Sequence, residues 1–135
     1  KGVTNITGEK LYEYHVIEAM EAVQNRYRAM VDFYVMLADP FVRQYTLYVE
    51  QSSLELFERD KFEKELARCN VEYQAKRQSG RLEAVRVVNL ELGTGEAYKA
   101  HCIQQGQRDS QFKVQKLQYA KDCLFDFMKY RRNPS

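Results

Sequence analysis

The chain has 135 residues, of which 44% are hydrophobic, enough for one domain with a real core and too few for two comfortable ones. Its 21 Lys and Arg residues and 19 Asp and Glu residues give a formal net charge of +2, with both signs mixed along the chain. This balance argues against a dedicated nucleic-acid or membrane-surface binder, because both usually carry a patch of one sign.

The first part of the chain predicts a helix followed by two strands. Apolar residues recur at helical spacing between residues 16 and 27, which predicts an amphipathic helix from about Leu11 to Arg28, with Thr7 as its cap. Residues 31–39 are β-branched and aromatic and end at an Asp-Pro turn, and residues 43–51 alternate apolar and polar side chains. The two segments favour an antiparallel pair.

The second part predicts further helices and strands in alternation. Asp60 and Glu63 resemble a capping box, and helical spacing of the apolar residues after them predicts one long helix that stops at Gly80. Residues 84–92 predict a third strand, and Thr94 caps a short helix through Gln105. Residues 111–117 predict a fourth, short strand. The last segment, 119–130, predicts a helix, although its aromatic residues would also suit an extended chain.

This order of elements predicts a single α+β domain, in which helices pack on a small mixed or antiparallel sheet of about four strands. Three cysteines, Cys69, Cys102 and Cys123, form no Cys-x-x-Cys pair and indicate neither a disulfide framework nor a zinc ribbon. A reducing cytoplasmic location fits this usage best. No run approaches a membrane span or a signal-peptide core, so we expect no membrane partner.

Lys113 is the residue whose placement most needs an explanation. In the predicted strand, Phe112 and Val114 point one way and Lys113 the other. Most lysines in such a position are surface residues whose stems lie along apolar side chains. The functional alternative is a cation presented to a phosphate or carboxylate during a reaction. Spacing alone does not decide between the two.

Other constellations favour structural interpretations. Gly93 and Gly95 precede a helix, where backbone amides could hold a phosphate, but the phosphate-loop pattern is absent. His101 and Cys102 are adjacent on a helix, where side chains diverge by about 100°, so we expect no metal site. The carboxylates from Glu55 to Glu65 are interleaved with basic residues, as on a solvated helix face.

Several motifs in one order carry a family resemblance. They are a helix containing a Tyr and an Arg before Gly-Arg, a strand, Gly-Thr before a short helix, and a glycine turn leading to Gln-aromatic-Lys. In this chain they are Tyr73, Arg77, Gly80, Arg81, Gly93, Thr94, Gly106, Gln111, Phe112 and Lys113. Together they resemble the C-terminal domain of the Gretchen Hagen auxin-responsive family of acyl-acid amido synthetases. The lead-in Asn5–Glu13 is similar to that family's interdomain hinge, with Lys10 at the hinge lysine.

The resemblance implies one part of an adenylate-forming ligase. Such an enzyme uses ATP and Mg²⁺, bound by a large N-terminal domain, to turn a carboxylic acid into an acyl adenylate, and then transfers the acyl group to an amino acid. The implied partners are that N-terminal ATP-binding domain, the acyl acid and the amino acid. Lys113 would be the catalytic lysine of adenylation, and Lys10 a hinge contact to nucleotide. The chain alone is expected to be inactive.

The same resemblance suggests boundaries and two departures. Residues 1–10 would be a hinge or linker, 11–130 a swivelling C-terminal domain and 131–135 a tail. The lack of an initiator Met before Lys1 fits a fragment, with the nucleotide-binding motifs lying upstream. Where the family has Pro-Arg after its lysine, this chain has Gln115 and Lys116, so a phosphate or partner contact would pass to Lys116. Beyond Tyr119 the plant pattern is not matched.

Two alternative functions, neither of them enzymatic, stay open. The domain could be a stand-alone, non-catalytic interaction module with the same fold, and the discriminator is whether the reading frame continues upstream with a phosphate loop. A small basic adaptor that uses residues 129–132 on phosphate-bearing partners would show a steep salt dependence of binding.

Overall fold

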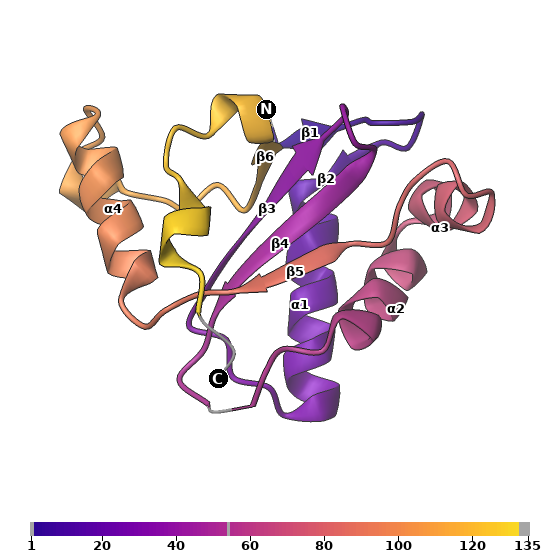
Figure 1. Ribbon diagram of the computed structural model, residues 1–135, viewed down its shortest axis with the longest axis horizontal. Helices are drawn as coiled ribbons and strands as arrows, with labels where there is room; N and C mark the ends of the chain where they lie inside the picture. The colour runs from indigo at the N-terminus through magenta and orange to yellow at the C-terminus, as the bar shows by residue number, and fades with distance from the viewer. Residues whose placement is uncertain (1, 54, 133–135) are drawn as a thin grey trace.

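The computed structural model describes residues 2–53 and 55–132, and within them the chain forms the expected single α+β domain (Figure 1). Its helices and strands are β1 (Val3–Thr4), β2 (Leu11–Tyr12), α1 (Glu13–Tyr27), β3 (Phe33–Asp39), β4 (Gln44–Glu50), α2 (Arg59–Cys69), α3 (Val71–Gln78), β5 (Arg86–Asn89), α4 (Thr94–Gln104) and β6 (Leu117–Tyr119). Short 3-10 turns cover Asp109–Gln111, Ala120–Asp122 and Phe127–Tyr130.

The main sheet is mixed and has the strand order β5-β4-β3-β6. Strands β3 and β4 form the predicted antiparallel pair, in register from Phe33 opposite Glu50 to Asp39 opposite Gln44. Strand β5 joins β4 in parallel, and β6 joins β3 in parallel. Strands β1 and β2 form a separate small antiparallel sheet next to β6.

The sheet is covered on both faces, as Figure 1 shows. Helices α1 and α2 close a first core, built around residues such as Met20, Leu47 and Leu66. Helix α4 and the C-terminal segment close a second core, which contains Val35, Tyr98 and Phe127. Burial of apolar side chains on both faces explains why β3 is nearly continuous in hydrophobic residues. No helix of the described ranges is long and apolar enough to cross a membrane.

The long helix predicted from Asp60 to Gly80 is two helices, broken at Asn70. The backbone of Asn70 is extended, and its buried side chain accepts a hydrogen bond from the amide of Tyr73 at 2.7 Å, which caps α3. Its amide nitrogen also donates to the carbonyl of Lys10 at 2.8 Å. Asn is a preferred residue at helix N-caps. The side chain of Asn70 caps α3 and also bonds the segment before β2, so the chain ends one helix and starts another at this residue.

The capping box predicted from Asp60 and Glu63 is also wrong. Helix α2 begins at Arg59, with Glu58 in the cap position. The carboxylate of Glu63 instead binds the hydroxyl of Tyr73 and the guanidinium of Arg77 on α3. Two residues of the family motif therefore hold α2 and α3 together. Thr7 does not cap α1 either, because α1 begins six residues later, at Glu13.

The helix predicted at residues 119–130 is wrong as well, and the alternative of an extended chain describes the segment better. Two short 3-10 turns flank an irregular stretch. Phe127 is buried, with ring centroids 5.0 Å from Tyr48 and 5.3 Å from Tyr98. Phe125 lies 5.4 Å from Tyr98 and 5.0 Å from Tyr130. Aromatic packing on α4 and the sheet thus replaces a regular helix.

Candidate functional site

Lys113 does not lie on a strand. The sequence predicts a strand at residues 111–117, but β6 begins only at Leu117, and residues 112–116 form no regular element. The expected alternation is nevertheless present, because Phe112 and Val114 are half-buried against the second core and Lys113 is exposed. The packing of Phe112 and Val114 therefore fixes the backbone on both sides of Lys113, whose side chain points into solvent.

The segment that carries Lys113 is also tied to α4. Lys99 on α4 forms an ion pair of 3.0 Å with Asp109, and its ammonium lies 5.7 Å from the ring centroid of Phe112. The ring of Phe112 lies 6.5 Å from that of Tyr98. In contrast, Lys113 belongs to no ion pair among the residues that the structure describes. Its charge is available to an external anion.

A cavity of about 260 Å³ lies beside Lys113. Its walls come from α4, from the segment before β6, from β6 and from the C-terminal segment, and its lining includes Tyr98, His101, Gln115 and Gln118. The hydroxyl of Tyr98 accepts a hydrogen bond of 3.2 Å from the Gln118 amide. Burial raises the pKa of Tyr98 to about 12, so this hydroxyl stays neutral. The cavity thus combines polar, uncharged groups with the cation of Lys113 and the carboxylate of Asp122.

Two thiols line this cavity, those of Cys102 and Cys123, and that of Cys123 is not an activated nucleophile. Cys123 is half-buried, and burial raises its pKa above the usual value. Its sulfur lies 3.6 Å from the carbonyl oxygen of Phe125, as a weak donor. No group of three or more His, Cys, Asp or Glu side chains within the described ranges could hold a metal ion.

Lys116 lies on the other face of the sheet. Its backbone amide donates to the carboxylate of Glu13 at 2.6 Å, and its carbonyl accepts from the amide of Met36 at 2.8 Å. Its ammonium lies 5.1 Å from the ring centroid of Tyr34, a residue of the first core. The recorded contacts therefore place Lys113 and Lys116 on opposite sides of the sheet and do not bring them together.

Lys10 lies on the connection between β1 and β2, far along the chain from both other lysines. Its side chain is exposed, while its backbone amide donates to Glu72 at 3.0 Å and its carbonyl accepts from Asn70. Within the described part of the chain, no ion pair involves Lys10. The backbone is fixed to the α2–α3 junction, and the ammonium is free to reach outward.

The sequence analysis missed the buried carboxylate next to Lys10. Glu9 is fully buried and accepts hydrogen bonds from the amides of Ile6 and Thr7, and from the Tyr45 hydroxyl at 2.6 Å. Burial alone would raise the pKa of Glu9, but the hydrogen bond from Tyr45 and those from the two amides outweigh it and hold the pKa below its usual value. The sequence could not reveal this buried carboxylate, because a Glu in a polar loop is usually exposed and nothing in residues 5–13 distinguishes Glu9.

The glycine turn before α4 is filled by another carboxylate that the sequence did not reveal. Glu50, at the end of β4, accepts from the amide of Gly93 at 2.9 Å and from that of Gly95 at 2.7 Å. Gly93 has a φ of 95° and is itself the cap residue, in place of the expected Thr94. The amides that could have held a phosphate are thus bound to the protein's own anion.

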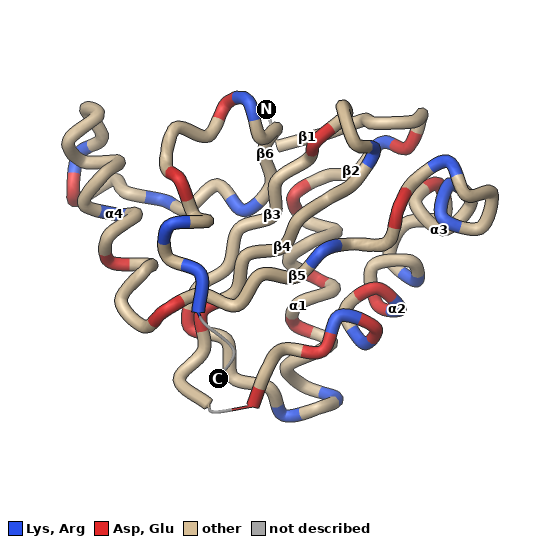
Figure 2. The backbone as a smooth tube through the Cα atoms, in the orientation of Figure 1, with Lys and Arg blue, Asp and Glu red and all other residues tan. Residues whose placement is uncertain are grey.

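Two carboxylates of α2, Glu63 and Glu65, differ from the expected solvated face, whereas Glu55, Glu58 and Asp60 are exposed as expected. Glu65 has 1% of its side chain exposed and lies 3.7 Å from both Arg26 and Arg68. Glu63 is bound by Tyr73 and Arg77, as described above. Lys and Arg are otherwise spread among Asp and Glu over the whole backbone, as Figure 2 shows. The distribution of charged residues along the folded backbone therefore agrees with the mixed charge pattern of the sequence.

The fold and its site define a class: a small α+β domain that presents an exposed lysine beside a polar cavity. The GH3 family C-terminal domain, as a sequence family, matches residues 14–121, which is more than half of the chain. The chain therefore belongs to the GH3 family, the Gretchen Hagen family of the resemblance, and corresponds to its C-terminal domain. No curated protein sequence matches the chain.

Solved structures agree in fold. A GH3.15 acyl acid amido synthetase superposes with a TM-score of 0.78 at 15% identity, over 98% of this chain and 26% of its own. An AtGH3.15 acyl acid amido synthetase in complex with 2,4-DB gives a TM-score of 0.68 at 16% identity, over 87% of this chain and 23% of its own. This chain thus spans about a quarter of the length of these synthetases.

Proposed function

We propose that this domain is the mobile C-terminal part of an ATP-dependent acyl-acid amido synthetase and that it supplies Lys113 to the adenylation step. The observation that carries the proposal is the placement of Lys113 in a chain of this family. The ammonium is exposed and has no ion-pair partner among the described residues, yet Phe112 and Val114 hold its backbone against the second core.

The chemistry follows from the charge that develops during adenylation. When a carboxylate attacks the α-phosphate of ATP, negative charge builds on the phosphoryl oxygens and on pyrophosphate. An ammonium brought close in a site closed to water stabilises that charge, and loss of one such donor typically costs a factor of about 10² to 10³ in rate. ATP and Mg²⁺ would be held by the large domain that, we propose, precedes this chain.

Two other lysines have subordinate roles in this proposal. Lys10, with its backbone fixed to the α2–α3 junction and its ammonium free, would contact nucleotide or the large domain when the domain rotates. Lys116 has its amide bound by Glu13 and its ammonium over Tyr34, which favours a structural role over the phosphate contact considered for it.

The test uses the full-length protein encoded by the complete reading frame. Pyrophosphate release is measured with ATP and Mg²⁺ across a panel of carboxylic acids for the parent and for Lys113→Ala. The matched control is Lys64→Ala, because Lys64 is also exposed and without an ion pair in the described part of the chain, but lies on α2. We expect a loss of about 10² to 10³ in the first variant and none in the second.

Two results would contradict the proposal. Acyl adenylate formed at the parent rate by Lys113→Ala would remove the role of that lysine. A reading frame without an upstream nucleotide-binding domain, together with no pyrophosphate release for any acid, would favour the non-catalytic interaction module instead.

A further inference from the structure

Strand β5 forms one edge of the main sheet, and part of its backbone faces away from the sheet. The amide of Leu90 donates to the carbonyl of Val49 in β4 at 2.8 Å, so the backbone groups of Leu90 face inward. Because consecutive residues of a strand direct their backbone groups to opposite sides, those of Asn89 and Val87 face outward. A row of outward groups of this kind is a template for another strand.

The chain's own C-terminal segment already uses one end of this edge. The amide of Arg132 donates to the carbonyl of Asn89, and the amide of Glu91 donates to the carbonyl of Tyr130, both at 2.8 Å. Leu90 and Arg131 form an antiparallel bridge there. None of the recorded hydrogen bonds outside the sheet ladder reaches Val87, within the ranges that the structure describes. The edge thus pairs with another segment at Asn89 to Glu91, while the backbone groups of Val87 have no recorded partner among the described residues.

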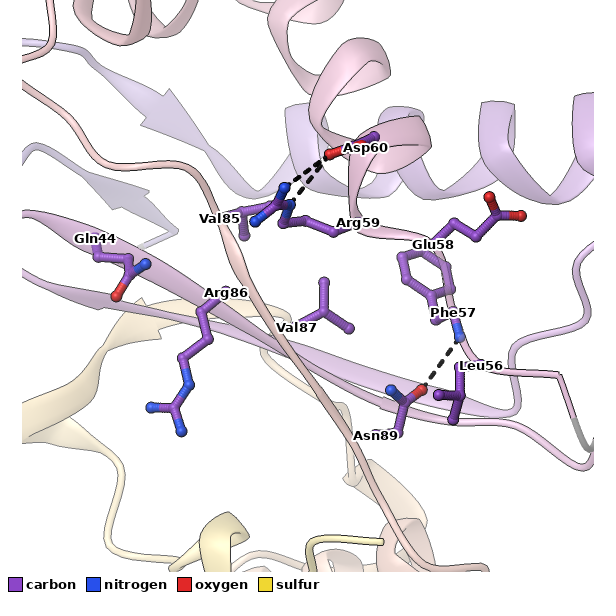
Figure 3. A pocket seen from close by; sticks show the side chains of 10 residues that line it. All are labelled: Gln44, Leu56, Phe57, Glu58, Arg59, Asp60, Val85, Arg86, Val87 and Asn89. Carbon is purple, nitrogen blue, oxygen red and sulfur yellow. Dashed lines mark hydrogen bonds and ion pairs between the residues drawn. The ribbon is translucent and has the colours of Figure 1, made fainter. Parts of the chain in front are cut away.

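A groove follows the same edge. A cavity of about 550 Å³ lies between β5 and residues 56–60, with Val87 and Leu56 among its lining side chains (Figure 3). An adjoining cavity of about 240 Å³ is lined by β5 and by Arg131 and Arg132. Leu56 is 55% exposed and lines both cavities, so it offers apolar surface next to the strand edge.

The two faces of this edge differ in chemistry. Arg86, Val88 and Leu90 alternate onto the α4 face, and Arg131 joins them as the bridge partner of Leu90. Neither Arg86 nor Arg131 forms an ion pair with any described residue, and no Asp or Glu lines the smaller cavity. On the α2 face, Val87 and Leu56 offer apolar surface next to the charged side chains of residues 58–60. A complementary strand would alternate acidic and apolar side chains.

We propose that the β5 edge binds an extended segment of a partner protein in which acidic and apolar residues alternate, added as a further strand of the sheet. Main-chain hydrogen bonds to Val87 supply affinity. Acidic side chains meet Arg86 and Arg131 on one face, and apolar side chains meet Leu56 on the other. This function is separate from the adenylation step and does not depend on it.

The binding experiment uses fluorescence anisotropy with a short labelled peptide of alternating Glu and Val. We expect saturable binding by this chain and none of a Lys and Val peptide. The double variant Arg86→Glu with Arg131→Glu should weaken affinity by about tenfold or more, because both charges are reversed. The control is Lys64→Glu with Lys121→Glu, which changes the net charge equally at exposed lysines away from β5.

A second measurement separates strand addition from simple charge attraction and needs no variant. Methylation of alternate backbone nitrogens of the peptide removes its main-chain donors on one edge and keeps its charge, so it should abolish binding. Hydrogen exchange of the Val87 amide should slow when the unmodified peptide is added.

Three outcomes overturn the proposal. Equal binding of the methylated peptide, or competition by free glutamate or inorganic phosphate at the same concentration, would mean a site for small anions only. Protection of the Val87 amide that grows with protein concentration, without any peptide, would mean that a second copy of this chain occupies the edge. Unchanged exchange at Val87 in the presence of saturating peptide would place the binding elsewhere.

Discussion

The hydroxyl of Tyr45 donates a hydrogen bond of 2.6 Å to the buried carboxylate of Glu9. Tyr45 lies on the central sheet and is fully buried, while Glu9 belongs to the lead-in between β1 and β2. The same hydroxyl lies 2.9 Å from that of Thr4. One tyrosine therefore joins the lead-in to the core of the domain, and the residues around it can be tested by their effect on stability.

Glu9→Gln is expected to lower the free energy of unfolding by about 1–3 kcal/mol at neutral pH, because charged hydrogen bonds are lost in a buried place. The pKa of Glu9 is below its usual 4.5, since hydrogen bonds outweigh the effect of burial. The stabilisation is thus present above that value and is lost as the pH falls through the lowered pKa. Urea unfolding of both proteins should show the difference shrink below about pH 4. A difference that stayed constant down to about pH 2 would contradict it.

His15→Gln is expected to flatten the pH dependence of stability near neutrality. The ring nitrogen Nδ1 of His15 accepts the backbone amide of Tyr12 at 3.0 Å, which caps α1. Burial lowers the pKa of His15 below 6.5, against the opposing charges of Glu18 and Glu72. The unfolded chain therefore takes up the proton first, and stability falls as the pH drops through 6.5. Thermal unfolding from about pH 8 to 5.5 measures the slope, and an identical slope in the variant would exclude His15 as its source.

Glu50→Ala is expected to destabilise the start of α4 by about 1–3 kcal/mol, because two amides lose a charged acceptor. The amides of Gly93 and Gly95 should exchange faster with solvent, while those of α1 keep their protection. Glu91→Ala serves as the control, since its carboxylate has no recorded hydrogen bond to these amides within the described residues. Unchanged exchange at Gly93 and Gly95 would remove the capping role.

Asn70→Ala is expected to cost about 1–2 kcal/mol, a typical loss for a helix cap. It also leaves the carbonyl of Lys10 without its 2.8 Å donor. Asn70→Asp separates the two functions, because it keeps the acceptor for Tyr73 and loses the donor to Lys10. We expect Asp to lose less stability than Ala in chemical unfolding, because only Asp keeps the acceptor for Tyr73. The reverse order would show that a carboxylate placed against the Lys10 carbonyl costs more than the cap contributes.

Local periodicity predicted much of the fold. The α1 helix, the β3–β4 pair and the α+β class are confirmed, because apolar spacing directly reports which side of an element is buried. The break at Asn70 could not be predicted, since the apolar spacing runs through it and the deciding bond comes from Lys10, 60 residues away. The helix predicted for the aromatic C-terminal segment was wrong for a similar reason, because the residues that Phe127 packs against, Tyr48 and Tyr98, lie on other elements.

The candidate site shows the same division. The exposed position of Lys113 between two half-buried neighbours was predictable from alternation, and family membership from the order of motifs. The predicted strand around Lys113 was wrong, because Phe112 and Val114 are held by α4 and the C-terminal segment instead of by a ladder of hydrogen bonds. Glu9 and Glu50 remained hidden because a carboxylate bound to backbone amides has no signature of its own in the sequence.

The attachments of the lead-in have a mechanical consequence. Asn5 donates to the hydroxyl of Tyr119 on β6 at 2.9 Å, and Lys10 is bound to Glu72 at the start of α3. A rotation that bent the chain between these two residues would have to break at least one of the two links, which lie on either side of Glu9. With both links intact, the lead-in is fixed to the sheet, so any rotation of the domain would move Lys10 and Lys113 together as parts of one rigid unit. Neither lysine could then approach a ligand on another body without the other lysine moving as well.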